Sequence, residues 1–481
     1  MNNTPSAAPQ TAAADAPDPR RWGALVVLLA GTFLPPLDFF IVNVALPSIR
    51  ADMNTDAAAV QLVISGYAAA YAVLLILGGR LGDLYGRRRV FVAGLLGFAA
   101  SSALCGFAWS PTVLIVGRVL QGCTAAIMAP QSLASIHALF PAKEKARALG
   151  FYGATFGLAS VAGQMLGGAL IAANPLGLGW RSVFLVNLPV VAITVPVALA
   201  LLRESQARQS SRLDLIGAVL LAVALSALVV PLIEGRERGW PIWAIVLLIA
   251  FLPLMRLFWR HEQHVVHRGG DPLVVPALLN VPGLWRGLAA TLFFYALAAF
   301  FMTFSVYEQA GLGRAPLNAG LAILPLAIGF LLGPLTSPWF SRRFGNKTSA
   351  VGMLLEATGL LGVAAVVVFI LPSAMSPALF LIGLGQGIAL PTLVRAVVDR
   401  VENRWAGLAA GLVNSVLQIS AALAVALIGG LFYAVLGARS DTAAIEHAFA
   451  ISTVAIGAAL VVAAFLISSV RQPAQAVVSE P

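Results

Sequence analysis

The feature that constrains this chain most is a series of apolar segments, each about 20 residues long, separated by short polar connections. A helix of about 20 residues crosses the ~30 Å hydrocarbon core of a bilayer. Only 10% of the residues are charged, against about 25% in a typical soluble domain, so we predict an all-α integral membrane protein. Fourteen segments qualify as transmembrane helices, at residues 23–46, 58–79, 90–109, 112–131, 150–172, 182–202, 214–233, 241–259, 287–308, 317–338, 348–371, 375–394, 407–436 and 447–469.

The basic residues predict how the chain is oriented. Lys and Arg concentrate in the cytoplasmic connections of membrane proteins. If the amino terminus is inside, only six of the 30 Lys and Arg residues fall in outer loops, and both termini are then cytoplasmic. The net charge of +10 is then explained by basic residues that face the anionic cytoplasmic surface of the membrane. Nucleic acid is therefore not expected as a partner. The six outer residues are Arg50, Arg181, Arg236, Arg238, Arg314 and Arg439.

The order of the segments predicts two bundles. Six spans precede and six follow an extra pair, 214–233 and 241–259, whose expected role is to link the bundles. The first residues have no apolar core, so they are expected to form a disordered tail rather than a signal peptide. The predicted parts are a cytoplasmic tail at 1–20, an N-terminal six-helix bundle at 21–203, two inserted transmembrane helices with cytoplasmic linkers at 204–285, a C-terminal six-helix bundle at 286–471 and a cytoplasmic tail at 472–481.

A glycine- and arginine-rich connection follows the second span, and we call Gly79–Arg89 the hinge loop. Its arginines cannot lie in hydrocarbon, and its small residues allow helix backbones to approach closely. An acid among them can bond an arginine or a helix N-terminus. The loop is either a topology anchor or part of a gate, and its candidate gating residues are Gly79, Asp83, Gly86, Arg87 and Arg88. A weaker copy, FSRRFGNK at 340–347, follows the tenth span.

Two ionisable residues lie inside the N-terminal bundle, Asp38 in the first span and Arg118 in the fourth. A carboxylate at that depth costs roughly 2.5–3.5 kcal/mol on insertion scales, so we expect Asp38 to face a cavity and to load and release protons. The alternative is that Asp38 is a structural acid, hydrogen-bonded to a neighbouring helix. Arg118 near Asp38 would favour the ionised acid, and helix movement would then change its affinity for a proton. A structural salt bridge is the alternative.

Several motifs resemble one transporter family. The hinge pattern G-x-L-x-D-x-x-G-R-R resembles the loop between helices 2 and 3 of the major facilitator superfamily, which helps to close its inward and outward gates. LDFFIVNVALP at 37–47 resembles the first-helix motif of the 14-helix drug:proton antiporter branch. This resemblance implies a role for Asp38 in proton coupling, and it links Arg118 and Gln121 to proton transfer.

The fifth span, GFYGATFGLASVAGQMLGGAL, is similar to the antiporter motif of that family. Gln164 stands where the motif has proline, which weakens the implication of antiport. Its glycines are expected to form close-packing helix faces. They are Gly157, Gly163, Gly167 and Gly168.

Other polar residues within spans are candidates for the substrate cavity or for further proton sites. Glu356 and Glu308 are possible proton or cation sites, with Glu308 expected at the water interface and Glu356 able to pair with a basic residue instead. His261, His264 and His267 could hold a metal on a helix, but we expect no metal site because no further ligand completes the set. The predicted cavity residues are Asn43, Gln61, Tyr67, Gln121, Gln164, Gln309, Asn414 and Gln418.

These observations predict a secondary transporter and not an enzyme. We expect a monomer that exports amphipathic small molecules across the cytoplasmic membrane by alternating access, with protons as the coupling ion and no cofactor. One alternative is a proton-coupled importer of a small organic solute, which Gln164 favours. The other is a membrane-bound sensor or lipid-modifying enzyme, for which the sequence contains no catalytic constellation.

Overall fold

The computed structural model describes residues 19–204, 214–371, 374–401 and 406–469. In these ranges the chain is helical and contains no strand. Thirteen stretches are long and apolar enough to cross a membrane, and one of them, Pro316–Phe369, covers two predicted spans that are separated by a turn at Gly345. The fourteen predicted spans are therefore confirmed. Most of the predicted tails, and the linker at 205–213, lie outside the described residues.

The first six spans form one bundle. Side-chain caps begin two of its helices, since Asp56 accepts from the Ala59 amide and Ser110 from the Val113 amide. Several helices continue past the predicted apolar limits because their polar ends extend beyond the membrane. The elements are α1 (Arg21–Asp52), α2 (Ala57–Tyr85), α3 (Arg87–Gly106), α4 (Pro111–Leu139), α5 (Ala142–Ala173), the 3₁₀ turns η1 (Pro175–Gly177) and η2 (Gly179–Arg181), α6 (Ser182–Leu185) and α7 (Asn187–Leu201).

The last six spans form the second bundle, which contains two π-helical turns, η4 and η8. Such turns interrupt the regular ladder of backbone hydrogen bonds and often lie at functional positions. The elements are α11 (Leu284–Phe294), η3 (Tyr295–Leu297), α12 (Ala298–Val306), η4 (Tyr307–Gly311), α13 (Pro316–Ala322), α14 (Leu324–Phe344), η5 (Gly345–Lys347), α15 (Thr348–Phe369), α16 (Met375–Val398), α17 (Ala406–Ala424), η8 (Val425–Gly429), α18 (Gly430–Leu436) and α19 (Thr442–Ser468).

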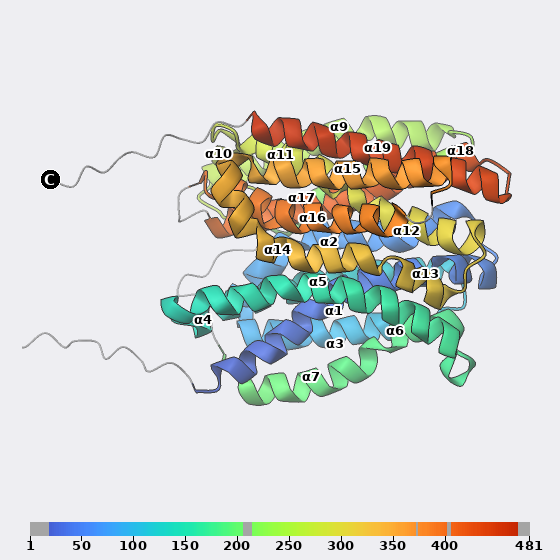
Figure 1. Ribbon diagram of the computed structural model, residues 1–481. Coiled ribbons are helices and arrows are strands. Elements are labelled where there is room, and N and C mark those ends of the chain that lie inside the picture. The colour runs from blue at the N-terminus through green and yellow to red at the C-terminus, as the bar shows by residue number, and fades with distance from the viewer. Residues whose placement is uncertain (1–18, 205–213, 372–373, 402–405, 470–481) are drawn as a thin grey trace, which may run out of the picture.

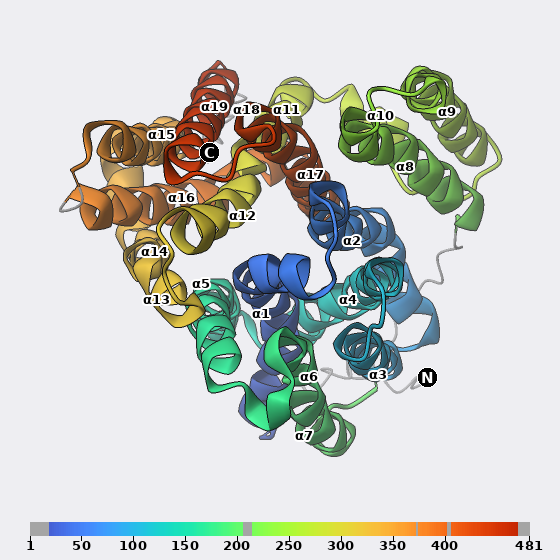
Figure 2. The ribbon, with the colours of Figure 1, turned by 90° about the vertical axis from the view of Figure 1, so that its right-hand side faces the viewer.

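Figure 1 shows the first turn of α1 and the last turn of α19 at the same end of the molecule, which we call the hinge end because the hinge loop lies there. Figure 2 shows α1–α7 grouped on one side and α11–α19 on the other. The inserted helices α8 (Leu215–Glu237) and α9 (Ile242–His267), with the short α10 (Pro276–Leu279), lie outside both groups, and α8 packs on α2. The two bundles meet along α1, α2 and α5 of the first and α12, α13, α14 and α17 of the second.

Glycines determine how closely some helices approach. A Cβ on Gly163 would lie 2.9 Å from the Leu37 carbonyl oxygen, and one on Gly167 would lie 3.0 Å from that of Ile41, so both positions hold α5 tightly against α1. Gly168 allows α5 to approach α13 of the second bundle, because its Cβ would lie 2.6 Å from the Pro316 carbonyl oxygen.

Two glycine predictions were wrong. A Cβ on Gly157 would lie 3.5 Å from Leu331 Cα, and one on Gly79 would lie 3.7 Å from Pro130 Cβ, both ordinary contacts. The close approach of α2 to α4 depends instead on Gly78, where a Cβ would lie only 2.2 Å from the Ala126 carbonyl oxygen. A one-residue change of position turns a helical side chain by about 100°, so neighbouring glycines face different surroundings.

Candidate functional site

The two embedded ionisable residues are in contact. Arg118 Nη1 donates to Asp38 Oδ2, and both side chains are fully buried. Gln121 Nε2 donates to Asp38 Oδ1 at 2.7 Å, and Arg118 Nε donates to the Val63 carbonyl oxygen at 2.9 Å. These donors pair the charge of the carboxylate and occupy lone pairs on both of its oxygens.

The sequence did not reveal two further members of this network. Asn187, the first residue of α7, donates to Asp38 Oδ1 at 3.1 Å and to Ser102 Oγ at 3.2 Å. Ser102 of α3 also accepts from Gln121 Nε2 at 2.8 Å. An amide side chain inside the predicted span 182–202 was a signal for Asn187, whereas a single serine such as Ser102 gave none. Asp38 is thus connected to α3, α4 and α7, and any shift between these helices changes its surroundings.

A cavity of about 1250 Å³ lies between the two bundles and extends from mid-membrane to the hinge end. It is larger than the 300–1,000 Å³ of most small-molecule sites. Its walls in mid-membrane include Phe39 and Phe40 of α1 and Tyr295 of η3, and its mouth at the hinge end includes Asp83 and Arg87.

Asp38 does not line this cavity, so the expectation that it faces a cavity was wrong. Tyr67 lies between the two. Its ring lines the cavity, and the Arg118 guanidinium carbon lies 4.3 Å from the ring centroid. The hydroxyl donates to the Pro35 carbonyl oxygen at 3.3 Å, which fixes the ring across α1. A single aromatic side chain therefore forms the wall between the buried ion pair and the cavity.

Of the eight residues predicted to line the cavity, the structure places Tyr67, Asn414 and Gln418 there. The other five do not line it, because each contacts its own helix or a neighbouring one. Gln121 bonds Asp38, and Asn43 donates to the Phe39 carbonyl oxygen of its own helix at 2.6 Å. The remaining three are buried or half-buried near the second bundle: Gln61 close to Gly429, Gln164 beside Gly320, and Gln309, whose Nε2 donates to the Val44 carbonyl oxygen at 2.9 Å.

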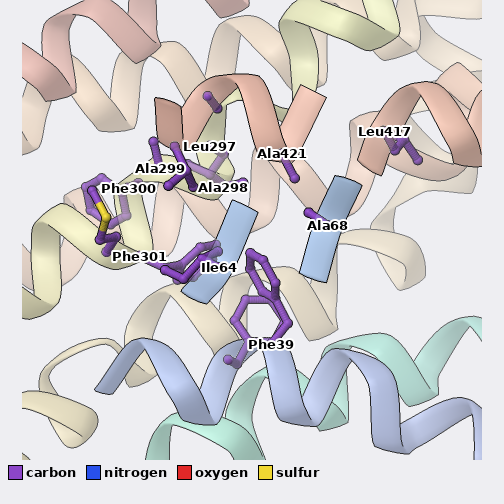
Figure 3. Close-up of a cluster of buried hydrophobic side chains, with 14 of the residues drawn as sticks. Phe39, Ile64, Ala68, Leu297, Ala298, Ala299, Phe300, Phe301, Leu417 and Ala421 are labelled. Atoms are coloured by element: carbon purple, nitrogen blue, oxygen red, sulfur yellow. The ribbon is translucent and has the colours of Figure 1, made fainter. Parts of the chain in front are cut away.

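The end opposite the hinge is closed by contacts between the bundles. Figure 3 shows Phe39, Ile64 and Ala68 of the first bundle lying across from Ala298, Phe301 and Ala421 of the second. The rings of Phe40 and Phe301 meet edge to face with centroids 4.8 Å apart. The Gln309 bond to α1 lies in the same half, and the Arg50 guanidinium lies 5.6 Å from the Tyr433 ring. The cavity is consequently accessible from the hinge end.

The hinge loop is bound within the first bundle. Asp83 Oδ1 accepts from Arg87 Nη2 at 3.1 Å, and Arg87 Nη1 donates to the Ala134 carbonyl oxygen of α4 at 3.1 Å. Glu204, just after α7, was missed: it accepts from the Arg88 amide at 3.0 Å and lies 3.7 Å from Arg89 Nε. A Cβ on Gly86, whose φ is +98°, would lie 2.4 Å from this carboxylate, so the turn requires glycine.

The copy of the hinge in the second bundle has the same turn but different contacts. Gly345 ends α14 with a φ of +52°. Arg342, Arg343 and Lys347 around it are exposed, whereas Arg87 and Arg88 are partly buried and bonded. This difference fits an open hinge end.

The inserted pair does more than link the bundles, which corrects the sequence interpretation. Residues within 266–277, from the end of α9 to the start of α10, line the mouth of the cavity, and Arg80 of α2 donates to the Asp271 and Pro272 carbonyl oxygens. Glu262 of α9 is buried and accepts from the Val274 amide at 2.8 Å. These bonds attach the wall of the mouth to α2 and α9.

Asp214 fixes the start of α8 at the same end. Burial acts to raise the pKa of Asp214, but donors from Gly217 and His261 hold it below its usual range. Burial raises the pKa of Glu262 to about 8, and the nearby Asp214 carboxylate acts in the same direction. His261 Nε2 lies 2.8 Å from Asp214 Oδ1, whereas His264 and His267 are exposed.

The two acids of the second bundle lie apart from the cavity. Glu356 is fully buried in α15, and neither carboxyl oxygen has a hydrogen-bond partner, so the expected alternative of pairing with a basic residue does not occur in the described chain. Burying a charged carboxylate without a partner costs free energy, because no hydrogen bond replaces those it makes to water. Glu308 was expected at the water interface, but it is 1% exposed and paired with Arg314 at 2.7 Å. The π-helical turn η4 turns its side chain inward.

The architecture and its central cavity agree with comparisons to known proteins. The sequence profile described as Major Facilitator Superfamily matches residues 28–425. The chain belongs to the major facilitator superfamily. It is therefore a transporter rather than an enzyme, a multi-pass membrane protein that takes a small-molecule substrate.

Major facilitator relatives with curated descriptions resemble it over most of their length. A "Probable actinorhodin transporter" of Streptomyces coelicolor is 38% identical, with 91% of this chain and 76% of that protein covered. The "Puromycin resistance protein pur8" of Streptomyces alboniger is 36% identical, with 87% and 83% covered. The "Drug efflux pump JefA" of Mycobacterium tuberculosis is 33% identical, with 87% and 82% covered.

The fold has counterparts among solved structures. A bacterial homologue of the human lysosomal transporter Spinster, in an inward-facing and unoccupied conformation, superposes with a TM-score of 0.66 at 18% identity and covers 94% of this chain and 97% of its own. At that identity the likeness concerns the fold alone.

Proposed function

We propose that this transporter exports amphipathic small molecules across the cytoplasmic membrane and that inward proton movement drives the export. Its similarity to transporters and resistance proteins for antibiotics supports the class of substrate. The observation that carries the proposal is the cavity, open at the hinge end, with an ion pair buried one side chain behind its wall.

The proposed coupling follows from the contacts of Asp38. In the present conformation Arg118, Gln121 and Asn187 all donate to it, which favours the ionised carboxylate. Asp38 and these donors all belong to the first bundle, so closure of the hinge end would have to shift α1 relative to α4 and α7 within that bundle. A carboxylate that lost the arginine in a low-dielectric interior would take up a proton, because an unpaired buried charge costs several kcal/mol. Proton binding and release would thus alternate with the accessible side.

Other residues have supporting roles in this proposal. When the hinge end closes, the hinge loop would pack against the second bundle. The copy at 340–347, whose basic residues are now exposed, would pack in the same way against the first bundle. Glu356, fully buried and without a hydrogen-bond partner at either carboxyl oxygen, is a second candidate proton site. We further propose that both termini are cytoplasmic, that the protein acts as a monomer and that no cofactor takes part. Inward movement of one charge supplies about 2.3 kcal/mol per 100 mV, so the entry of one or two protons suffices to maintain a concentration gradient of the exported substrate.

Direction and coupling can be tested together. A susceptibility panel in a bacterial host without its own major pumps identifies the compound whose toxicity the transporter reduces most. That compound is then added to everted membrane vesicles with an acidic lumen, where an exporter accumulates it and releases lumenal protons. An importer accumulates nothing and releases no protons, which would refute the proposal.

The acid is tested in the same vesicles. Asp38→Asn is expected to abolish proton-driven accumulation while the protein remains in the membrane. Asp52→Asn, in the same helix but at the opposite end, serves as the matched control and is expected to leave accumulation unchanged. Undiminished flux in the Asp38 variant would remove this residue from the coupling.

A further inference from the structure

The walls of the cavity at mid-membrane are mainly aromatic. The Tyr67 and Tyr71 rings are stacked with centroids 6.1 Å apart, and Tyr152 and Phe156 meet edge to face at 5.6 Å. Rings arranged in this way offer faces and edges to a flat aromatic compound, which packs best by offset stacking or edge-to-face contact. The aromatic residues come from both bundles and are Phe39, Phe40, Tyr67, Tyr71, Tyr152, Phe156 and Tyr295.

Acidic side chains are kept away from this aromatic part. Asp38 is behind Tyr67 and bound to Arg118, and Glu356 is buried in α15 away from the cavity. Among the described lining residues, the ionisable side chains other than tyrosine are all at the hinge end: Arg80, Asp83, Arg87, His137 and Asp271.

A permanent cation that entered this part would find no counter-ion. Aromatic faces attract cations, but this attraction is smaller than the desolvation penalty of an unpaired ion. One face is also occupied, since the Arg118 guanidinium already lies over Tyr67. The aromatic part therefore disfavours positive charge.

Neutral hydrogen-bonding groups complete the lining. Asn414 Nδ2 donates to the Ala410 carbonyl oxygen at 2.9 Å, which leaves the Asn414 carbonyl oxygen free to accept from a ligand. Gln418, one turn further along α17, also faces the cavity. Hydroxyl and carbonyl groups on a flat ring system would find partners here.

We infer that the substrates of this cavity are uncharged, flat aromatic compounds that carry hydroxyl or carbonyl groups, and that permanently cationic aromatics of similar size are excluded. This inference rests on the proposed function, because it names the class of compound that the transporter exports. Selectivity comes from the absence of an accessible carboxylate in the aromatic part.

Equilibrium dialysis with the full-length protein in lipid nanodiscs tests the inference, with empty nanodiscs as the blank. The probes are 1,8-dihydroxyanthraquinone, which is neutral at pH 6, and ethidium, a flat permanent cation. The neutral compound is expected to bind at least tenfold more tightly. Equal or tighter binding of ethidium would overturn the inference, and so would binding of neither compound, because the cavity would then not be the substrate site.

A single substitution sharpens the test. Asn414→Asp places a carboxylate in the aromatic part and is expected to raise ethidium affinity at least tenfold. Asn280→Asp makes the same chemical change at an exposed position outside the cavity and is expected to change nothing. An Asn414 variant that leaves ethidium affinity unaltered would overturn the inference. Binding is measured without a gradient, so failure of proton-driven export in vesicles would refute the proposed function alone.

Discussion

The buried ion pair gives the sharpest prediction, because its two partners can be removed separately or together. Asp38→Asn leaves Arg118 charged and buried without its carboxylate, and Arg118→Gln does the converse. Removing one partner of a buried pair destabilises a protein by roughly 3–5 kcal/mol, whereas removing both is often nearly neutral. We expect about 3 kcal/mol for the aspartate variant, at the lower end, because the new amide can still accept from Gln121.

The control is an aspartate in the same helix with an exposed partner. The side chain of Asp52 is 49% exposed and pairs with Arg181 at 2.8 Å, whereas that of Asp38 is 0% exposed. Exposed pairs contribute about 0–1 kcal/mol, so Asp52→Asn is expected to change stability by no more than that.

Equilibrium unfolding in mixed micelles measures the double-mutant cycle. The double variant Asp38→Asn with Arg118→Gln is expected to be more stable than either single variant and yet to lack proton-driven transport. Folding and coupling would then be separated in one protein. The reasoning is refuted if Asp38→Asn destabilises the protein no more than Asp52→Asn, or if the two single effects simply add.

Three further predictions concern packing and gating. Gly78→Ala is expected to destabilise the protein by about 1–3 kcal/mol because its Cβ would lie 2.2 Å from a backbone oxygen, whereas Gly79→Ala should be tolerated; thermal unfolding of both variants checks this. Tyr67→Ala should expose the ion pair to the cavity and allow substrate-independent proton leak in vesicles, while Tyr67→Phe should remain tight; equal leak in both would contradict the role of the ring. Glu204→Gln should weaken the hinge contacts and reduce transport several-fold without changing substrate affinity. Flux in vesicles measures transport and equilibrium dialysis measures affinity, and a changed affinity would contradict this prediction.

Much of the architecture could be read from the sequence. The length of each apolar segment predicted the fourteen spans, because the thickness of a bilayer imposes one length on every helix that crosses it. Asp38 and Arg118 stood out for the same reason, since charge in hydrocarbon is costly enough to need a partner. The hinge loop was recognisable because three arginines and a turn glycine follow one another along the chain.

The direction that each polar side chain faces could not be read in this way. The spans are apolar on nearly all sides, so their sequences contain little information about which face meets lipid, a neighbouring helix or a cavity. Gln121 and Asn43 are as polar as Asn414, yet the first two are buried inside the first bundle, and of the three only Asn414 meets the cavity.

The number of spans, the position of the hinge loop and the need to pair two charges within the membrane thus follow from the amino-acid sequence. The place of Asp38 behind Tyr67, the bond between Glu204 and the hinge loop and the wall that the inserted pair adds to the mouth became evident only from the packed helices. This is because crossing a membrane depends on the composition of one segment, whereas a site depends on the rotation of several helices about their axes, which is settled when they pack together.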